Sequence, residues 1–184
     1  LKKHINPTTE ISGTFNIQDR PDFRRVNQEL SFGWIFHEKK PITWHINPIL
    51  ISIIDIELTE KFKSQIEDLN DQYISASFQD HVVAGGVFSF EYNNQKFKYN
   101  SRAFYFKSTL ELAGGSLFRI HELINKEKDL VTNSYNFLGI RYAHYQKITF
   151  DIRYYQPFSK KAKMVYRLYS GVGIPQSNLN KALP

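Results

Sequence analysis

The residue types that most often carry out chemistry are scattered along this chain. Its six histidines stand at positions 4, 37, 45, 81, 121 and 144, and it contains no cysteine. The segment HELIN, which starts at His121, begins like a zinc-protease helix, but Asn125 stands where the second histidine ligand is needed. We therefore expect no metal site, no cofactor and no thiol chemistry.

Other catalytic motifs are also incomplete. The segments AGGVF and AGGSLF lack the spacing and the Lys-Ser/Thr pair of a phosphate-binding loop, and their glycines are more typical of a bulge or a close approach of strands. The chain has no Gly-x-Ser-x-Gly nucleophile elbow. The neighbouring carboxylates of Glu67 and Asp68 fall on the polar side of a predicted helix, where such pairs are usually solvated. We expect that the protein is not an enzyme.

Charged residues instead follow one face of a predicted strand. In residues 147–154, the apolar Ile148, Phe150, Ile152 and Tyr154 alternate with Lys147, Thr149, Asp151 and Arg153. Successive side chains of a strand point to opposite faces, so one face is apolar and the other is charged. Such charges are costly in a dry core, whereas a wet barrel interior lets them pair across strands, and Arg167 is a candidate partner for Asp151. The charges that we expect to face the lumen are Lys107, Glu111, Asp151, Arg153 and Arg167.

The composition limits the classes of partner. The 184-residue chain carries a formal net charge of +6 and is 15% aromatic. Its basic clusters, HEKKP, INKEKDL and FSKKAK, lie in predicted turns and loops and do not interleave with aromatic residues as a nucleic-acid stacking platform would. We expect no nucleic-acid partner. Ordinary solvated turns and contact with anionic lipid headgroups both remain open for these clusters.

Period-two alternation of apolar residues dominates the chain and predicts an all-β fold. Seven antiparallel strands are expected at about 10–18, 25–37, 42–56, 82–92, 99–112, 138–158 and 163–174. Pro48, inside the third strand, predicts a bulge, an interruption or a sheet edge. Apolar residues at steps of three and four predict one amphipathic helix at about 59–76, and residues 113–137 are expected to be irregular.

Two environments would suit the apolar face of these strands. The expected strand at 138–158 is far longer than strands of soluble proteins, which run about 5–6 residues, and long loops tend to gather at one end, as in a transmembrane barrel. Four aromatic residues near predicted strand ends are candidates for a membrane-interface girdle, although strand propensity explains each one equally well. They are Trp34, Trp44, Tyr154 and Tyr155.

The last part of the chain resembles a known family. ITFDIRYYQPFSKKAKMVYRLYSGVGIPQSNLNKALP, together with GGVFSFEYNN and FYFKSTLELAGGSL, resembles the barrel of the BamA/TamA family, also called bacterial surface antigens, which assemble and translocate proteins at the outer membrane of Gram-negative bacteria. The resemblance covers nearly the whole chain. It implies that residues 1–184 form the fifth to eleventh strands of a sixteen-strand barrel, with the 59–76 helix in an extracellular loop and no periplasmic POTRA domain.

The resemblance also implies partners and a location. These are outer-membrane lipids, client outer-membrane proteins, accessory assembly proteins and the remainder of the same barrel, in the bacterial outer membrane. The chain stops before the loop motif that carries the family's best-known arginine, so no functional residue is carried over. Seven strands cannot close such a barrel, and we expect this chain to be incomplete on its own. The alternatives are a soluble lipocalin-like barrel that binds a small apolar ligand, and a porin or lipid-modifying barrel enzyme.

Overall fold

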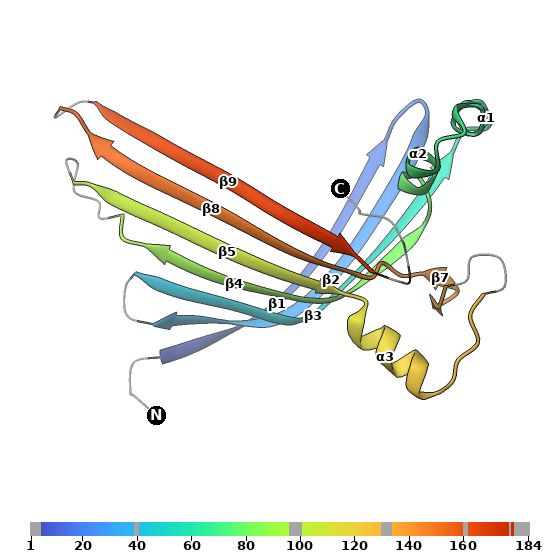
Figure 1. Cartoon of the computed structure of the whole chain (residues 1–184), viewed down its shortest axis with the longest axis horizontal. Helices are drawn as coiled ribbons and strands as arrows, with labels where there is room; N and C mark the ends of the chain where they lie inside the picture. The colour runs from blue at the N-terminus through green and yellow to red at the C-terminus, as the bar shows by residue number, and fades with distance from the viewer. Residues whose placement is uncertain are drawn as a thin grey trace.

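The computed structural model describes residues 5–38, 41–95, 101–129, 134–159, 162–176 and 178. Predicted features outside these ranges are His4, the lysines at 39–40 and 160–161, the first residues of the strand expected at 99–112, and most of the segment after Pro175. Within these residues the fold consists of one large curved antiparallel sheet, a separate two-stranded hairpin and three helices (Figure 1).

The large sheet has seven strands, as the alternation predicts, and their order is β1-β2-β3-β4-β5-β8-β9. Every neighbouring pair is antiparallel, so the chain runs up and down from one edge to the other. Within the described residues the sheet does not close on itself: β1 and β9 form open edges. The strands are β1 (Ile5–Asp19), β2 (Phe23–Glu38), β3 (Ile42–Leu58), β4 (His81–Asn93), β5 (Ala103–Ala113), β8 (Tyr145–Pro157) and β9 (Lys163–Pro175).

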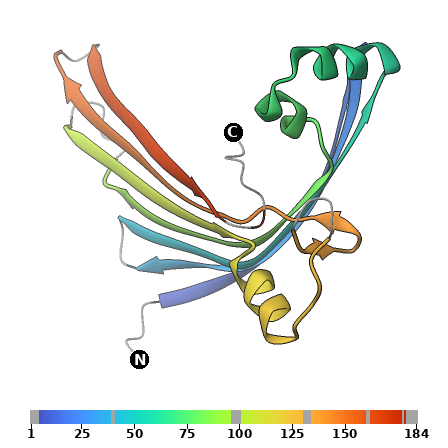
Figure 2. The same ribbon diagram turned by 45° about the vertical axis from the view of Figure 1, so that its right-hand side comes forward.

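The sheet is bent into an open trough with a convex underside (Figures 1 and 2). A β-bulge lies in β3 at Pro48, because β3 has one more residue there than β2 on one side and β4 on the other. Pro48 has no N–H to donate, which suits a residue left outside the ladder. Of the three outcomes expected at this proline, a bulge, an interruption or a sheet edge, the structure has the bulge.

Two glycines allow strands to approach closely beside this bulge. A Cβ atom on Gly33 would lie 2.5 Å from the carbonyl oxygen of Ile46, and one on Gly85 would lie 1.9 Å from that of Leu112. Both distances are too short for any side chain, so these positions require glycine while the backbone keeps this curvature.

The connections divide between the two ends of the sheet. At the end on the right of Figure 1, residues 59–80 carry α1 (Glu60–Leu69) and α2 (Gln72–Ser77), and residues 114–144 carry α3 (Gly115–Leu123) and the hairpin of β6 (Asn136–Phe137) and β7 (Ile140–Arg141). The opposite end has the shorter connections between β2 and β3, β4 and β5, and β8 and β9.

Three sequence-based assignments need correction. The helix expected at 59–76 is two helices, because Asn70 adopts a left-handed conformation (φ 47°) that ends α1. The segment expected to be irregular, 113–137, contains α3 and β6. The strand expected at 138–158 begins only at Tyr145, because Leu138 and Gly139 have positive φ angles of 53° and 81° and form the tight turn between β6 and β7.

Helices α1 and α2 lie against the trough through a cluster of aromatic rings. The Phe62 ring of α1 lies 6.3 Å from that of Phe23 at the start of β2, and Phe78 lies within 5.4 Å of both rings. Thr59 caps α1 by accepting a hydrogen bond from the Phe62 N–H, and its own hydroxyl donates to the Asp22 carbonyl. These contacts fix the helical loop over the turn between β1 and β2.

Candidate functional site

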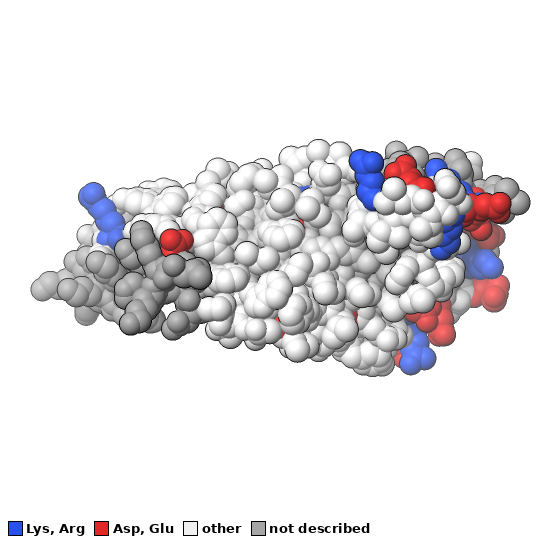
Figure 3. Space-filling view, turned by 90° about the horizontal axis from the view of Figure 1, so that it is seen from below, with Lys and Arg blue, Asp and Glu red and all other residues white. Residues whose placement is uncertain are grey.

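The convex face of the sheet is apolar on all seven strands. The strand register places every second side chain of each strand on this face. Among these described residues, Asp, Glu, Lys and Arg occur only near the two ends of the strands. Figure 3 shows this underside, with charged residues gathered toward the end that carries the long loops. Representative members are Ile11, Phe15, Leu30, Trp34, Trp44, Phe90, Phe106, Phe150, Tyr154, Leu168 and Val172.

Aromatic rings connect neighbouring strands across this face. The Trp44 ring lies 4.7 Å from Phe90, Phe90 lies 6.0 Å from Phe106, and Phe106 lies 6.4 Å from Phe150. Most of the representative residues of the convex face are also exposed: the exposed fraction is 73% for Ile11 on the edge strand β1 and 37% for Phe150 on β8. Monomeric soluble proteins rarely expose so large a contiguous apolar surface.

The uncharged band has a defined height. It covers every second residue from 26 to 36 in β2, 82 to 92 in β4, 146 to 156 in β8 and 164 to 174 in β9, a span of about ten residue steps in each strand. At about 3.3 Å per residue the band is about 33 Å long along a strand, and about 25 Å high if the strands tilt by about 40° as in transmembrane barrels. On β2 and β3, the charged residues Arg24, Asp55 and Glu57 mark its upper limit at the long-loop end.

The concave face carries the ionic groups. Asp151 on β8 accepts hydrogen bonds from Arg153 Nε at 3.0 Å and from Arg167 Nε on β9 at 3.1 Å, and each guanidinium also contacts the second carboxylate oxygen. The pairing predicted between Asp151 and Arg167 is therefore confirmed. Tyr105 stacks on Arg153, with 4.9 Å between the guanidinium carbon and the ring centre.

Polar pairs continue along the concave face on either side of this cluster. Lys107 pairs in register with both Glu91 and Asp151, and Glu111 lies opposite Lys147 and accepts a hydrogen bond from the Tyr145 hydroxyl. Nearer β3, hydroxyl groups bond across strands: Ser52 donates to Asn27 at 2.8 Å, and Ser89 lies 3.0 Å from Thr109. In this part of the inner face, hydrogen bonds and ion pairs join neighbouring strands. Toward the long-loop end, Leu50, Val83, Ala113 and Tyr145 form a small apolar cluster on the same face.

The structure divides the predicted interface aromatics. Trp34, Trp44 and Tyr154 lie on the convex face, whereas Tyr155 lies on the concave face, because successive residues of β8 point to opposite sides. The Lys163 ammonium lies 5.6 Å from the centre of the Tyr155 ring. Tyr155 therefore cannot share the environment of the other three. All five predicted lumen charges, Lys107, Glu111, Asp151, Arg153 and Arg167, lie on the concave face.

Helix α3 and the β6–β7 hairpin form a small second core on the outside of the trough, which we call the outer cap (residues 114–129 and 134–144). Fully buried Val82 and Tyr142 are at its centre, and Leu117, Phe118, Phe137 and Ile140 pack around them from the cap side. The sheet contributes Ile51, Ile53 and Ala84, which belong to the convex face. The sequence signal for this helix is the spacing of Leu117, Phe118 and His121, whose side chains face this core.

Polar groups buried in the outer cap fix its position. The Asn178 side chain, after β9, donates to the carbonyls of Tyr135 and Tyr142 and accepts from the Tyr135 N–H. The Tyr142 hydroxyl lies 3.3 Å from His121 Nδ1, and the His144 ring stacks on Phe118 with 4.9 Å between ring centres. Burial lowers the pKa of both histidines below the usual 6.5 and raises the pKa of Tyr142 to about 12.

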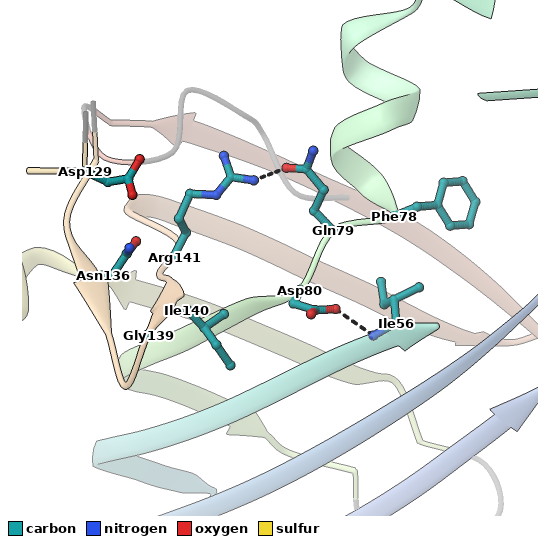
Figure 4. A pocket seen from close by; sticks show the side chains of 9 residues that line it. All are labelled: Ile56, Phe78, Gln79, Asp80, Asp129, Asn136, Gly139, Ile140 and Arg141. Carbon is teal, nitrogen blue, oxygen red and sulfur yellow. Dashed lines mark hydrogen bonds between the residues drawn. The ribbon is translucent and has the colours of Figure 1, made fainter. Parts of the chain in front are cut away.

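An open pocket of about 420 Å³ lies where the end of β3 and the segment after α2 meet the β6–β7 hairpin. Figure 4 shows its polar lining, in which Asp80 accepts a hydrogen bond from the Ile56 N–H and Arg141 donates to Gln79. The side chains of Asp80, Gln79 and Arg141 are thus already hydrogen-bonded within the pocket.

Within the described ranges, no three His, Asp or Glu side chains gather closely enough to hold a metal ion, and no helix is long and apolar enough to span a membrane.

No family model, no curated protein and no solved structure matches this chain.

Proposed function

We propose that this chain is a central part of an outer-membrane β-barrel that helps to insert or export other outer-membrane proteins. The observation that carries the membrane part of the proposal is the uncharged convex band, which crosses all seven strands opposite an ionic concave face. At the strand tilt of known transmembrane barrels, about 40°, the band would be about 25 Å high, which matches the apolar band of those barrels, in which lipid-facing and lumen-facing residues alternate along every strand.

The open edges support the same proposal. Strands β1 and β9 leave the N–H and C=O groups of one side without a neighbouring strand in the described residues. In a bilayer each unpaired backbone group costs several kcal/mol, so a spanning sheet requires closure. We propose that further strands pair with β1 and β9 and complete the barrel, with the concave face lining its interior.

The assembly role is supported by sequence resemblance alone. The sequence of residues 148–184, which includes most of β8 and all of β9, resembles the BamA/TamA family, whose barrels insert or export other outer-membrane proteins. Under this proposal the long-loop end faces the outside of the cell and the short turns face the periplasm.

The test has two parts. The intact protein should be recovered from Gram-negative cells with the outer membrane after carbonate extraction, and its depletion should lower the amounts of several unrelated barrel proteins in that membrane. Recovery in the soluble fraction without detergent would reject the membrane location. Normal amounts of all other barrel proteins after complete depletion would reject the assembly role and leave the location standing.

A lipocalin-like barrel is the soluble alternative. It needs apolar residues on the concave face, where its ligand would bind, and a polar surface outside. The concave face of this sheet instead carries Lys107, Glu111 and the Asp151 cluster, while the apolar residues point outward. The arrangement thus gives an apolar ligand little to contact.

A further inference from the structure

The outer cap exposes large apolar side chains that its own core does not use. The exposed fractions are 81% for Leu123, 64% for Ile124 and 50% for Ile120, all at the end of α3, and 74% for Leu138 at the turn of the β6–β7 hairpin. A polar residue at any of these positions would leave the small core of the cap unchanged. Their apolar character therefore needs a contact outside the described structure.

The exposed residues occupy one flank of α3. Ile120 precedes Leu123 by three residues and Ile124 by four, so the three side chains are neighbours on the helix surface. Leu117 and Phe118 face the cap core instead. The polar flank carries the ion pair of Arg119 and Glu122, whose side chains are 83% and 46% exposed. Helix α3 is thus apolar on two adjoining flanks, and only one of these is covered.

The position of the cap along β3 suggests what covers the second flank. Ile49 on the convex face is 49% exposed and belongs to the uncharged band, whereas Asp55 is exposed at the charged rim. The two outward residues between them, Ile51 and Ile53, are the ones that the cap covers. The cap therefore sits at the height where the uncharged band ends.

We infer that the outer cap is an anchor in the lipid interface, and that the Ile120, Leu123 and Ile124 flank of α3, together with Leu138, inserts at the boundary between headgroups and acyl chains. This inference rests on the proposed barrel. A helix at that boundary needs an apolar flank toward the acyl chains and a polar flank toward water, and Arg119 on the polar flank reaches the headgroup level. Because the cap lies where the uncharged band ends, lipid is the occupant that the position favours.

Single-cysteine labelling tests this directly, because the chain has no cysteine of its own. Leu123→Cys, Glu122→Cys on the polar flank and Phe150→Cys in the middle of the band would each carry an environment-sensitive fluorophore. The intact protein would be reconstituted in phosphatidylcholine–phosphatidylglycerol vesicles. Quenching would be measured with aqueous iodide and with nitroxide lipids labelled at shallow or deep positions.

We expect the Leu123 label to be quenched most by shallow nitroxides and several-fold less by iodide than the Glu122 label, and the Phe150 label to be quenched most by deep nitroxides. If Leu123 and Glu122 labels are equally open to iodide while the Phe150 label stays in lipid, the anchor is rejected and the barrel stands. If the Phe150 label is also open to iodide, the barrel itself is rejected. Ile124→Cys repeats the test should Leu123→Cys fail to reconstitute.

Discussion

Three side chains of strand β9 have nearly equal exposed fractions, but in the proposed barrel they would face different surroundings. Leu168 and Ile174 lie on the convex face and have exposed fractions of 62% and 58%, and Tyr169, on the concave face, is 61% exposed. We consider one substitution, arginine, at each of the three positions. In water, substitutions at exposed sites usually change the free energy of unfolding by no more than about 0.5 kcal/mol, so the three variants would be alike.

In a bilayer the three costs differ, and the geometry gives their size. Leu168 lies near the middle of the uncharged band, and Ile174 is six residues further along β9, about 20 Å along the strand and about 15 Å along the membrane normal. An arginine facing lipid costs about 2–4 kcal/mol at the midplane and about 0–1 kcal/mol near the interface. Tyr169 lies on the concave face, which the proposed barrel leaves in contact with water, so an arginine there stays hydrated and should cost less than about 1 kcal/mol, although Arg153 and Arg167 already occupy the neighbouring Asp151.

The assay is urea unfolding of the intact protein in lipid vesicles, which reports the free energy of unfolding of each variant. Leu168→Arg should lower it by about 2–4 kcal/mol, and Ile174→Arg and Tyr169→Arg should each lower it by less than about 1 kcal/mol. Equal costs at positions 168 and 174 would refute the assignment of the convex face to lipid. A larger cost at position 169 than at 168 would reverse the two faces.

Three further predictions concern the outer cap and the curvature of the sheet. Asn178→Ala removes three buried hydrogen bonds, so we expect hydrogen exchange in the cap to become faster by the equivalent of about 1–3 kcal/mol. Unchanged exchange would contradict the role of Asn178 in holding the cap together. Burial keeps the pKa values of His121 and His144 below those of the unfolded chain, so protonation favours the unfolded cap. The stability of the cap should therefore be complete above about pH 6.5 and should fall as the pH is lowered. Hydrogen exchange in the cap at pH 7.5 and 5.0, corrected for the intrinsic exchange rates, would measure this loss. Gly85→Ala should prevent folding into vesicles, because its Cβ would collide with a backbone carbonyl oxygen of β5, whereas Gly13→Ala, with open space around it, should fold normally, and equal folding yields would contradict this.

The main sheet was predictable because its signal is local. Side chains alternate with period two, so seven strands, two chemically different faces and the Asp151–Arg167 pair follow from residue order and strand pairing. Pro48 likewise indicated an irregularity in its strand, because proline cannot donate a hydrogen bond to the ladder. The position of Tyr155 near a strand end predicts an interface aromatic, but alternation with Tyr154 places the two side chains on opposite faces, and Tyr155 lies on the concave one.

The outer cap was not predictable in the same way. Its helix is only nine residues long, and its core is shared with the convex face of β3 and β4, so the contacts that stabilise it lie far away in the sequence. Leu138 appeared to continue a strand because the residues after it alternate. Leucine rarely adopts the left-handed conformation that Leu138 has beside Gly139, so its residue type gave no sign of the turn.

The most direct test of the account is a spin-label scan of β8, with single cysteines at each position from 146 to 156 in the intact protein reconstituted in vesicles. We predict that accessibility to apolar oxygen rises at every second residue, at Ile148, Phe150, Ile152 and Tyr154, with the deepest positions in the middle of the strand. Accessibility to a water-soluble nickel complex should rise at the residues between them. A scan without this alternation, or with high nickel accessibility at Phe150 and Ile152, would contradict the assignment of the convex face to lipid.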